Sequence, residues 1–548
     1  MLGVPLGSQA KNAEFVQRKL FSRLDKTVDR LKDFDDSQSA FFLLRVSFSI
    51  VRAVHFMRTT PLPDWVEESA RFDVEIRTAA EAILGFQFED ETSYLQACLT
   101  PSLGGFGLRR TAVHADAAYA ASFLEAMGES GESWSVPSVV LSAPVCSQKA
   151  ASYEIDKKIH AGLVARAVTR RERKRLERIT EPHAGAWVTA VPSIDDGFDT
   201  VMQPQVFRTA AAYRLGTPVV PHDIPCPLCT QTVDKLGDHA SCCKKTGDNT
   251  VRHNRVRDLL ARFCGEGLLS PIVELRNLLS SSNARPGDVT IPNWHSGRPL
   301  AIDVAVTSPF TLFFTSPFTL FGMRSEEPAD SYGLVYKHRK YDRRFRGKEP
   351  IFAALVMEST GGLSQEALSL LKSIFRFASR RQNIQHCVYV GRAWARLSCN
   401  LQTSVAQSIL NRIDGSVYQR GTSAVLSDHE LVTVSSCSSS SASSASVSFS
   451  EPASVSSSQV FPVPASVLLE PGASSAVVFN DHESVAASSS GPSPLSLSHS
   501  LLTTLDCKGL RLLARHSLAG PTLLFRVGSL LAGAFLLPSV GLRNRMFR

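Results

Sequence analysis

The chain has 548 residues, a net charge of +8 and 43% hydrophobic residues, so it is long enough to hold two to four domains. Its eleven cysteines show no disulfide-framework spacing, which excludes a secreted, disulfide-stabilised protein and predicts a reducing nuclear or cytoplasmic compartment. The N-terminus lacks the charged start and apolar core of a signal peptide. The apolar run 527–537 is shorter than the ~20 residues that cross a membrane, so we expect no membrane partner.

The first 130 residues are predicted to form a helical domain. Apolar residues recur there at helical spacing in two segments. They are Leu20, Leu24, Val28 and Leu31, followed by Phe72, Ile76, Ala80 and Ile83. Residues 41–54 are apolar nearly all round, which is typical of a buried helix. Residues 104–108 predict a turn and residues 115–124 a further helix.

Residues 131–219 are predicted to form a helical and basic linker region. Its most charged segment, residues 166–178, predicts a basic helix. One interpretation is a solvated charged face, and the other is contact with nucleic-acid phosphates. Under the second interpretation the binding residues are Arg170, Arg171, Arg173, Lys174 and Arg175.

Residues 220–262 contain four potential zinc ligands within a short span. They are Cys226 and Cys229, separated by two residues, then His239 and Cys243. Thiolates and imidazole in this number suit a structural, tetrahedral zinc site, so we predict a zinc knuckle. Cys242 competes for the fourth position, and a chance cysteine cluster is the alternative. The residues that could reach phosphates from the following helix start are Arg252, His253 and Arg255.

From residue 271 the pattern changes to alternating strands and helices, and residues 263–413 predict an α/β domain. The predicted strands are residues 289–291, 300–306, 351–357 and 387–390. Residues 336–344 predict a basic helix and residues 365–379 an amphipathic one. A near-perfect duplication, in which Thr307 to Phe313 recurs eight positions later at Thr315 to Phe321, is expected to lie in a loop.

Two aspartates in this domain are candidate ligands of a catalytic Mg²⁺ or Mn²⁺. Asp288 stands at a strand start, and Asp303 lies within the next strand on the face opposite Leu300, Ile302, Val304 and Val306. A carboxylate in an apolar strand needs a metal or a partner to offset desolvation. Structural hydrogen bonds are the alternative explanation. The further candidate site residues are Lys337, Lys340, Glu274 and Glu358.

Residues 414–548 are predicted to be a disordered tail. Residues 421–506 contain no Lys or Arg and are dominated by Ser, Ala, Val and Pro, which bury little apolar surface. The positive charge therefore belongs to the folded part, where it suits a phosphate-rich partner. The predicted fold class is α+β multidomain, with a helical N-terminal region, a zinc knuckle, an α/β nuclease-like domain and this tail.

Five short segments carry a family resemblance. They are Cys226 to Cys229, residues 237–240, 252–254 and 285–288, and residues 303–307. They resemble the C-terminal half of non-LTR retrotransposon polyproteins, in the subgroup with a zinc knuckle and a restriction-enzyme-like endonuclease after the reverse transcriptase. In this family the lysine is displaced from the second acid onto the following helix, which fits Ala305 and the lysines at 337 and 340. Gly287 before the acid is a mild departure.

The N-terminal region resembles the post-palm segment of the same family. Residues 3–8 are similar to the glycine turn after the polymerase active site, residues 104–108 to a thumb motif and residues 211–216 to the stretch before the zinc knuckle. The sequence has no Tyr-x-Asp-Asp motif, and neither Asp-Asp pair, at 35–36 or 195–196, lies in an apolar strand hairpin. We therefore expect no polymerase activity, with the chain starting downstream of the palm.

The resemblance implies a protein that binds DNA and retroelement RNA and nicks target DNA by metal-dependent hydrolysis, with no small-molecule substrate. The alternative is a catalytically degenerate remnant that only binds nucleic acid through its zinc knuckle and basic helices. Ala305 and the duplicated loop favour decay, whereas the lysine pair favours activity. A host regulatory protein that uses the Ser-rich tail for partners is a third hypothesis, based on composition alone.

Overall fold

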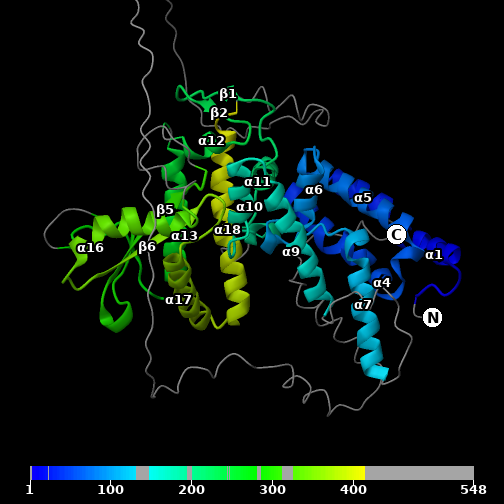
Figure 1. The fold of residues 1–548 in the computed structure, drawn as a ribbon. Coiled ribbons are helices and arrows are strands. Elements are labelled where there is room, and N and C mark those ends of the chain that lie inside the picture. The colour runs from blue at the N-terminus through cyan, green and yellow to red at the C-terminus, as the bar shows by residue number, and fades with distance from the viewer. Residues whose placement is uncertain are drawn as a thin grey trace, which may run out of the picture. The chain divides into compact units, whose positions relative to one another are not determined.

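The computed structural model describes residues 3–22, 24–130, 147–193, 200–243, 245, 247–279, 285–310 and 325–413, which belong to one compact unit. Helices predominate and accompany two small sheets (Figure 1). The predicted α+β class is therefore confirmed in this coarse form. The serine-rich tail, the second copy of the duplication and Asp195-Asp196 lie outside the described residues.

The N-terminal part is helical, as predicted. Its helices are α1 (Gln9–Phe21), α2 (Leu24–Lys32), α3 (Ser37–Leu43), α4 (Ile50–Thr59), α5 (Val66–Leu84), α6 (Glu91–Cys98) and α7 (Thr111–Ser130). Both predicted apolar stripes are buried in one core cluster. A π-helical turn at Leu44–Phe48 interrupts the predicted buried helix, and the Ser49 hydroxyl donates to the Arg45 carbonyl at 2.8 Å there.

The stretch Ser37–Thr59 is the one described segment that is long and apolar enough to cross a membrane, a criterion that core helices of soluble proteins also meet. Ala40, Phe41 and Leu44 on α3 and the π-turn pack in the core cluster, together with Phe56 and Met57 of α4. These contacts fit helices of a protein core.

The basic segment 166–178 is split between two helices. Helix α9 (Gln148–Arg166) ends at the first residue of this segment, and α10 (Arg170–Arg178) covers its last nine residues. The Thr169 hydroxyl accepts from the Glu172 amide at 3.1 Å and caps the new helix. Helix α11 (Pro204–Leu215) follows and ends at Gly216, which adopts a φ of 71°.

The zinc-knuckle region contains a two-stranded antiparallel sheet of β1 (Ile224–Pro225) and β2 (Thr232–Val233), then the short helix α12 (Asp238–Cys242). Helix α13 (Asp248–Glu266) follows and runs across the predicted domain boundary at residue 262.

The main sheet has the order β3 (Ile272–Val273), β4 (Val289–Ile291), β5 (Leu300–Thr307) and β6 (Ile351–Glu358). β5 and β6 are parallel, and the other pairs are antiparallel. The β5–β6 connection carries α15 (Pro328–Tyr332), a π-helical turn (Gly333–His338) and α16 (Arg339–Phe345). The alternation predicted for β5 is confirmed, since Leu300, Ile302 and Val304 enter the main core while Ala301 and Ala305 lie in separate clusters.

The last two helices are α17 (Gln365–Arg381), as predicted, and α18 (His386–Leu410). The strand predicted at residues 387–390 is wrong, since this segment begins α18. A four-residue apolar run fits a strand or a helix equally well, and the apolar positions that follow decide for the helix. Cys399 and Ala406 of α18 join the N-terminal core, whereas Leu397 and Leu401 join the core of the sheet. Helix α18 thus contributes to both cores.

Candidate functional site

The structure brings the four predicted zinc ligands together. One ligand atom from each of Cys226, Cys229, His239 and Cys243 lies within 4.8 Å of all the others. The Cys229 thiol lies 3.3 Å from His239 Nε2 and 3.9 Å from the Cys243 thiol. The Asp234 carboxylate accepts from the His239 amide at 2.7 Å and fixes the start of α12. This group can hold a metal ion.

Cys242 lies outside this ligand group. Its thiol contacts the Ser241 hydroxyl at 3.4 Å, and burial raises the pKa of the thiol. The structure resolves the choice between the two cysteines in favour of Cys243, because the Cys243 sulfur lies within 4.8 Å of the other three ligand atoms.

The two candidate acids lie on neighbouring strands. Asp288 immediately precedes β4, and Asp303 lies in the middle of β5, next to the paired residues Val289 and Ile302. One Asp288 carboxylate oxygen accepts from the Val304 amide at 2.6 Å and lies 3.2 Å from His253 Nε2 on α13. Burial alone would raise the pKa of Asp288, but the hydrogen bonds from His253 and Val304 hold it below its ordinary value.

Lys337 forms an ion pair with Asp303, and its ammonium also lies 3.4 Å from the Val304 carbonyl. The side chains of Lys337 and Asp303 are 17% and 10% exposed, so the pair is largely desolvated. Burial raises the pKa of Asp303, with the charge of Lys337 opposing it. Burial alone would lower the pKa of Lys337, but the charge and the hydrogen bond of Asp303, with smaller contributions from Tyr332 and Asp288, together raise it. The site therefore has two carboxylates and one cation.

Lys337 belongs to the π-helical turn Gly333–His338, which runs directly into α16. Lys340 is directed elsewhere, since its ammonium lies 4.7 Å from the centre of the Tyr341 ring. Of the two lysines, the structure thus places Lys337 at the acids.

The other two candidate acids are engaged by arginines. Glu274 pairs with Arg257 and Arg285, while its backbone amide donates to the Asp288 carbonyl at 2.8 Å, so it borders the site. Glu358 pairs with Thr307 in the sheet, four residues beyond Asp303, and accepts from Arg178 at 2.8 and 3.0 Å. The structure does not bring Glu358 to the other acids.

Most of the predicted phosphate-binding side chains of α10 make contacts within the protein. Arg171 donates to Asp238 at 2.8 Å, Lys174 to the Glu326 carbonyl at 3.1 Å, and Arg175 to the Arg214 carbonyl at 2.7 Å. Arg170 and Arg173 are exposed. Most charged residues of this helix therefore stabilise the fold. The sequence had suggested either a solvated face or contact with phosphates, and neither interpretation included contacts within the protein.

The three residues predicted to reach phosphates from α13 have different environments. Arg252 is buried and donates to the Ser241 carbonyl at 2.9 Å, so it supports helix α12, which carries His239. His253 contacts Asp288, a placement that sequence reasoning missed because the two lie 35 positions apart. Arg255 is exposed.

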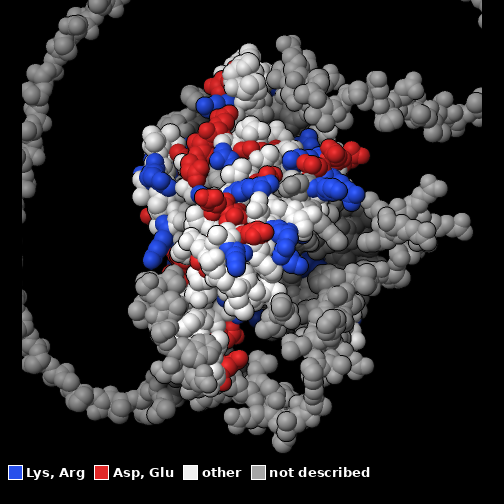
Figure 2. Space-filling model, turned by 90° about the vertical axis from the view of Figure 1, so that its right-hand side faces the viewer, with Lys and Arg blue, Asp and Glu red and all other residues white. Residues whose placement is uncertain are grey.

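Acidic and basic side chains are interspersed on the face of the molecule shown in Figure 2. The net charge therefore gives no single-sign surface on that face. No protein-family model matches this chain, and no curated protein matches it. The candidate sites rest on the geometry of the described residues.

Proposed function

We propose that this chain is the zinc-binding and endonuclease part of a retrotransposon-derived protein that nicks DNA by metal-dependent phosphodiester hydrolysis. The observation that carries the proposal is the grouping of Asp288, Asp303 and Lys337 from two neighbouring strands and a separate helical turn. The proposed partners are DNA and the RNA of the element, and polymerase activity is not part of the proposal.

Asp288 and Asp303 would hold a Mg²⁺ or Mn²⁺ ion, since hard cations prefer carboxylate oxygens. The two aspartates flank the paired residues Val289 and Ile302 on neighbouring strands. When bound, such an ion activates a water and neutralises charge on the phosphate. Lys337 stabilises the negative charge that develops on the scissile phosphate. His253 positions Asp288 by contacting one of its oxygens.

The group formed by Cys226, Cys229, His239 and Cys243 would hold a structural zinc ion. Three thiols and one imidazole leave no open position for a substrate in a tetrahedral site. Its function would be to order the loop that precedes α13, which carries His253 at its N-terminal end.

The test is nicking of a supercoiled plasmid with Mg²⁺ by the full chain and by the Asp288→Ala variant. We expect the wild type to nick and the variant to lose about 100-fold or more, with DNA affinity nearly unchanged. Asp258→Ala is the matched control, because Asp258 is a half-exposed acid on α13 outside the site.

Nicking by the control should equal that of the wild type. If the wild type nicks no faster than Asp288→Ala with either Mg²⁺ or Mn²⁺, the proposed endonuclease activity is rejected. Retained zinc-dependent DNA binding in that case would favour the degenerate binding protein.

A further inference from the structure

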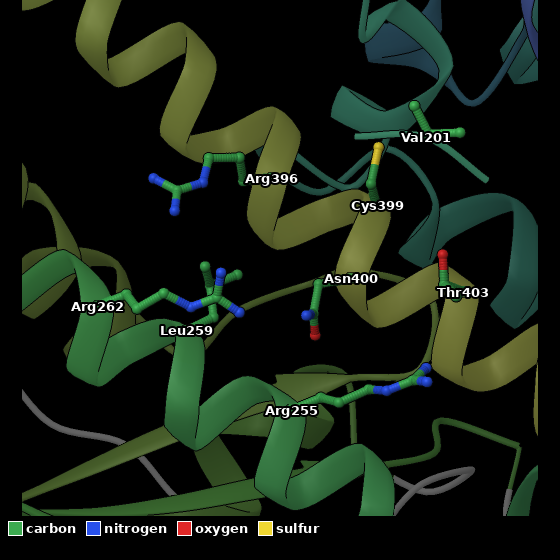
Figure 3. Close-up of a pocket in the computed structure, with 8 residues that line it drawn as sticks. All are labelled: Val201, Arg255, Leu259, Arg262, Arg396, Cys399, Asn400 and Thr403. Atoms are coloured by element: carbon green, nitrogen blue, oxygen red, sulfur yellow. The ribbon is translucent and has the colours of Figure 1, made fainter. Parts of the chain in front are cut away.

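A cavity of about 220 Å³ lies between α13 and α18, and arginine side chains line it (Figure 3). Arg255 and Arg262 project into it from α13, and Arg396 borders it from α18. Asn400 and Thr403 add neutral polar groups from the following turns of α18. We call this cavity the α13–α18 pocket.

The α13–α18 pocket carries two uncompensated positive charges. Arg396 donates to Glu266 at 2.7 Å and lies over the Phe263 ring, so its charge is neutralised within the protein. Among the described residues, Arg255 and Arg262 form no ion pair, and Arg255 has only a long 3.4 Å contact to the Ser404 hydroxyl. Two of the three guanidinium groups thus remain for an anion.

The spacing of the two arginines aligns them along one groove. Arg262 follows Arg255 by seven positions, which places the two on the same face of α13, about 10 Å apart along its axis. His253 precedes Arg255 by two residues, a rotation of about 200°, and it contacts Asp288. The α13–α18 pocket therefore lies on the opposite side of α13 from the two acids.

We propose that the α13–α18 pocket binds a backbone phosphate of a nucleic-acid strand that passes outside the nuclease site. Guanidinium groups match phosphate oxygens in geometry, and neutral amide and hydroxyl groups such as Asn400 and Thr403 commonly complete such contacts. The cavity is smaller than the roughly 300–1000 Å³ of small-molecule sites, so it suits one phosphate group of a polymer better than a whole nucleotide.

This inference goes beyond the proposed function and rests on it only for the choice of a nucleic acid as the partner, because the pocket uses neither the acids nor Lys337. A protein without cleavage activity would still bind a strand here. Binding measured in Mg²⁺-free buffer therefore separates the failure of one idea from the failure of the other.

The test compares the full chain with the double variant Arg255→Gln, Arg262→Gln. Both residues are exposed, so the fold should be retained, as checked by circular dichroism. Binding of single-stranded DNA, single-stranded RNA and duplex DNA of equal length is measured against salt concentration. We expect the slope of log affinity against log salt to fall by about one unit, the value for one phosphate contact, for at least one of them, and the strand that is affected identifies the ligand.

The matched control is Arg376→Gln, Arg380→Gln, which removes the same charge from exposed positions of α17. If the salt slope decreases equally in the control, the effect comes from the change in net charge alone, and the proposal is overturned. A second arm adds inorganic phosphate in place of chloride at constant ionic strength. If phosphate stabilises the wild type but not the double variant, while all strands bind both proteins equally, the pocket takes free phosphate and the proposal is overturned.

Discussion

At the scale of single residues, removing one partner of the ion pair between Lys337 and Asp303 should destabilise the fold. Lys337→Met leaves a buried carboxylate without its cation, so we expect the free energy of unfolding at pH 7 to fall by about 2 to 4 kcal/mol. Urea denaturation measures this change, with Lys340→Met as the control.

Lys340 does not contact Asp303, so its loss should change stability by less than about 1 kcal/mol. The double variant Asp303→Asn, Lys337→Met should be more stable than the sum of the two single changes implies, because it leaves no unpaired charge. Equal losses from the two lysine variants would contradict the assignment of Lys337.

His183 predicts a pH dependence of stability. Its ring stacks on Trp394 with 4.0 Å between ring centres, and burial, aided by the charge of Lys372, lowers its pKa to about 4. Below about pH 6.5 the unfolded chain takes up a proton that the folded chain does not, so the free energy of unfolding falls as the pH decreases from about 6.5 to 4. We expect a loss of about 1 to 2 kcal/mol, since His183 is partly exposed.

His183→Asn is the variant that tests this dependence. Asn tolerates the φ of 67° at this position and does not titrate. Thermal denaturation of both proteins between pH 4.5 and 7.5 should show a smaller pH dependence in the variant. Parallel curves over this range would show that His183 keeps an ordinary pKa.

At the scale of elements, the zinc knuckle gives a prediction with a built-in control. Cys243→Ser removes a ligand from the metal group, whereas the adjacent Cys242→Ser leaves the group intact. We expect one zinc per chain in the wild type and in Cys242→Ser, and a marked loss of bound zinc in Cys243→Ser. Metal analysis of protein purified under reducing conditions measures this.

Loss of zinc should also loosen α12, because metal binding and local folding share the same free energy in small zinc sites. Hydrogen exchange of residues 224–243 should then be faster in Cys243→Ser. Equal zinc content in the two serine variants would show that the ligand group is assigned wrongly.

The elements differ in how far the sequence predicts them. The β5 alternation, the amphipathic pattern of α17 and the ligand spacing around Cys226 are local signals, and the structure bears them out. The partners of α10 are not local: Arg178 binds Glu358, 180 positions away, through a buried ion pair. Charged residues are buried only when a partner compensates their charge. Because composition cannot reveal a partner so far away in the sequence, it suggested an exposed helix.

At the scale of the whole molecule, α18 contributes side chains to both cores, although the sequence suggested a strand where this helix begins. Leu401 is fully buried in the core of the sheet, and Cys399 lies in the N-terminal core. We expect Leu401→Ala to lower the free energy of unfolding by about 2 to 5 kcal/mol.

Because α18 joins the two cores, the loss should be felt in both. Hydrogen exchange should accelerate in α5 of the N-terminal core as well as in β5 of the sheet. Acceleration confined to β5 would mean that the two cores unfold independently.

The π-helical turn at Gly333–His338 has an evolutionary consequence. A π-turn accommodates one more residue than the corresponding turn of an α-helix, so losing a single codon there would restore the α-helix and change which position of the turn faces the acids, while α16 keeps its direction. A lineage could exchange which position supplies the cation by such a step, with the sheet and both acids unchanged. Sequence searches that demand a fixed offset between Asp303 and the lysine would then overlook relatives that keep this ion pair, whereas searches that allow a variable offset across the turn would retain them.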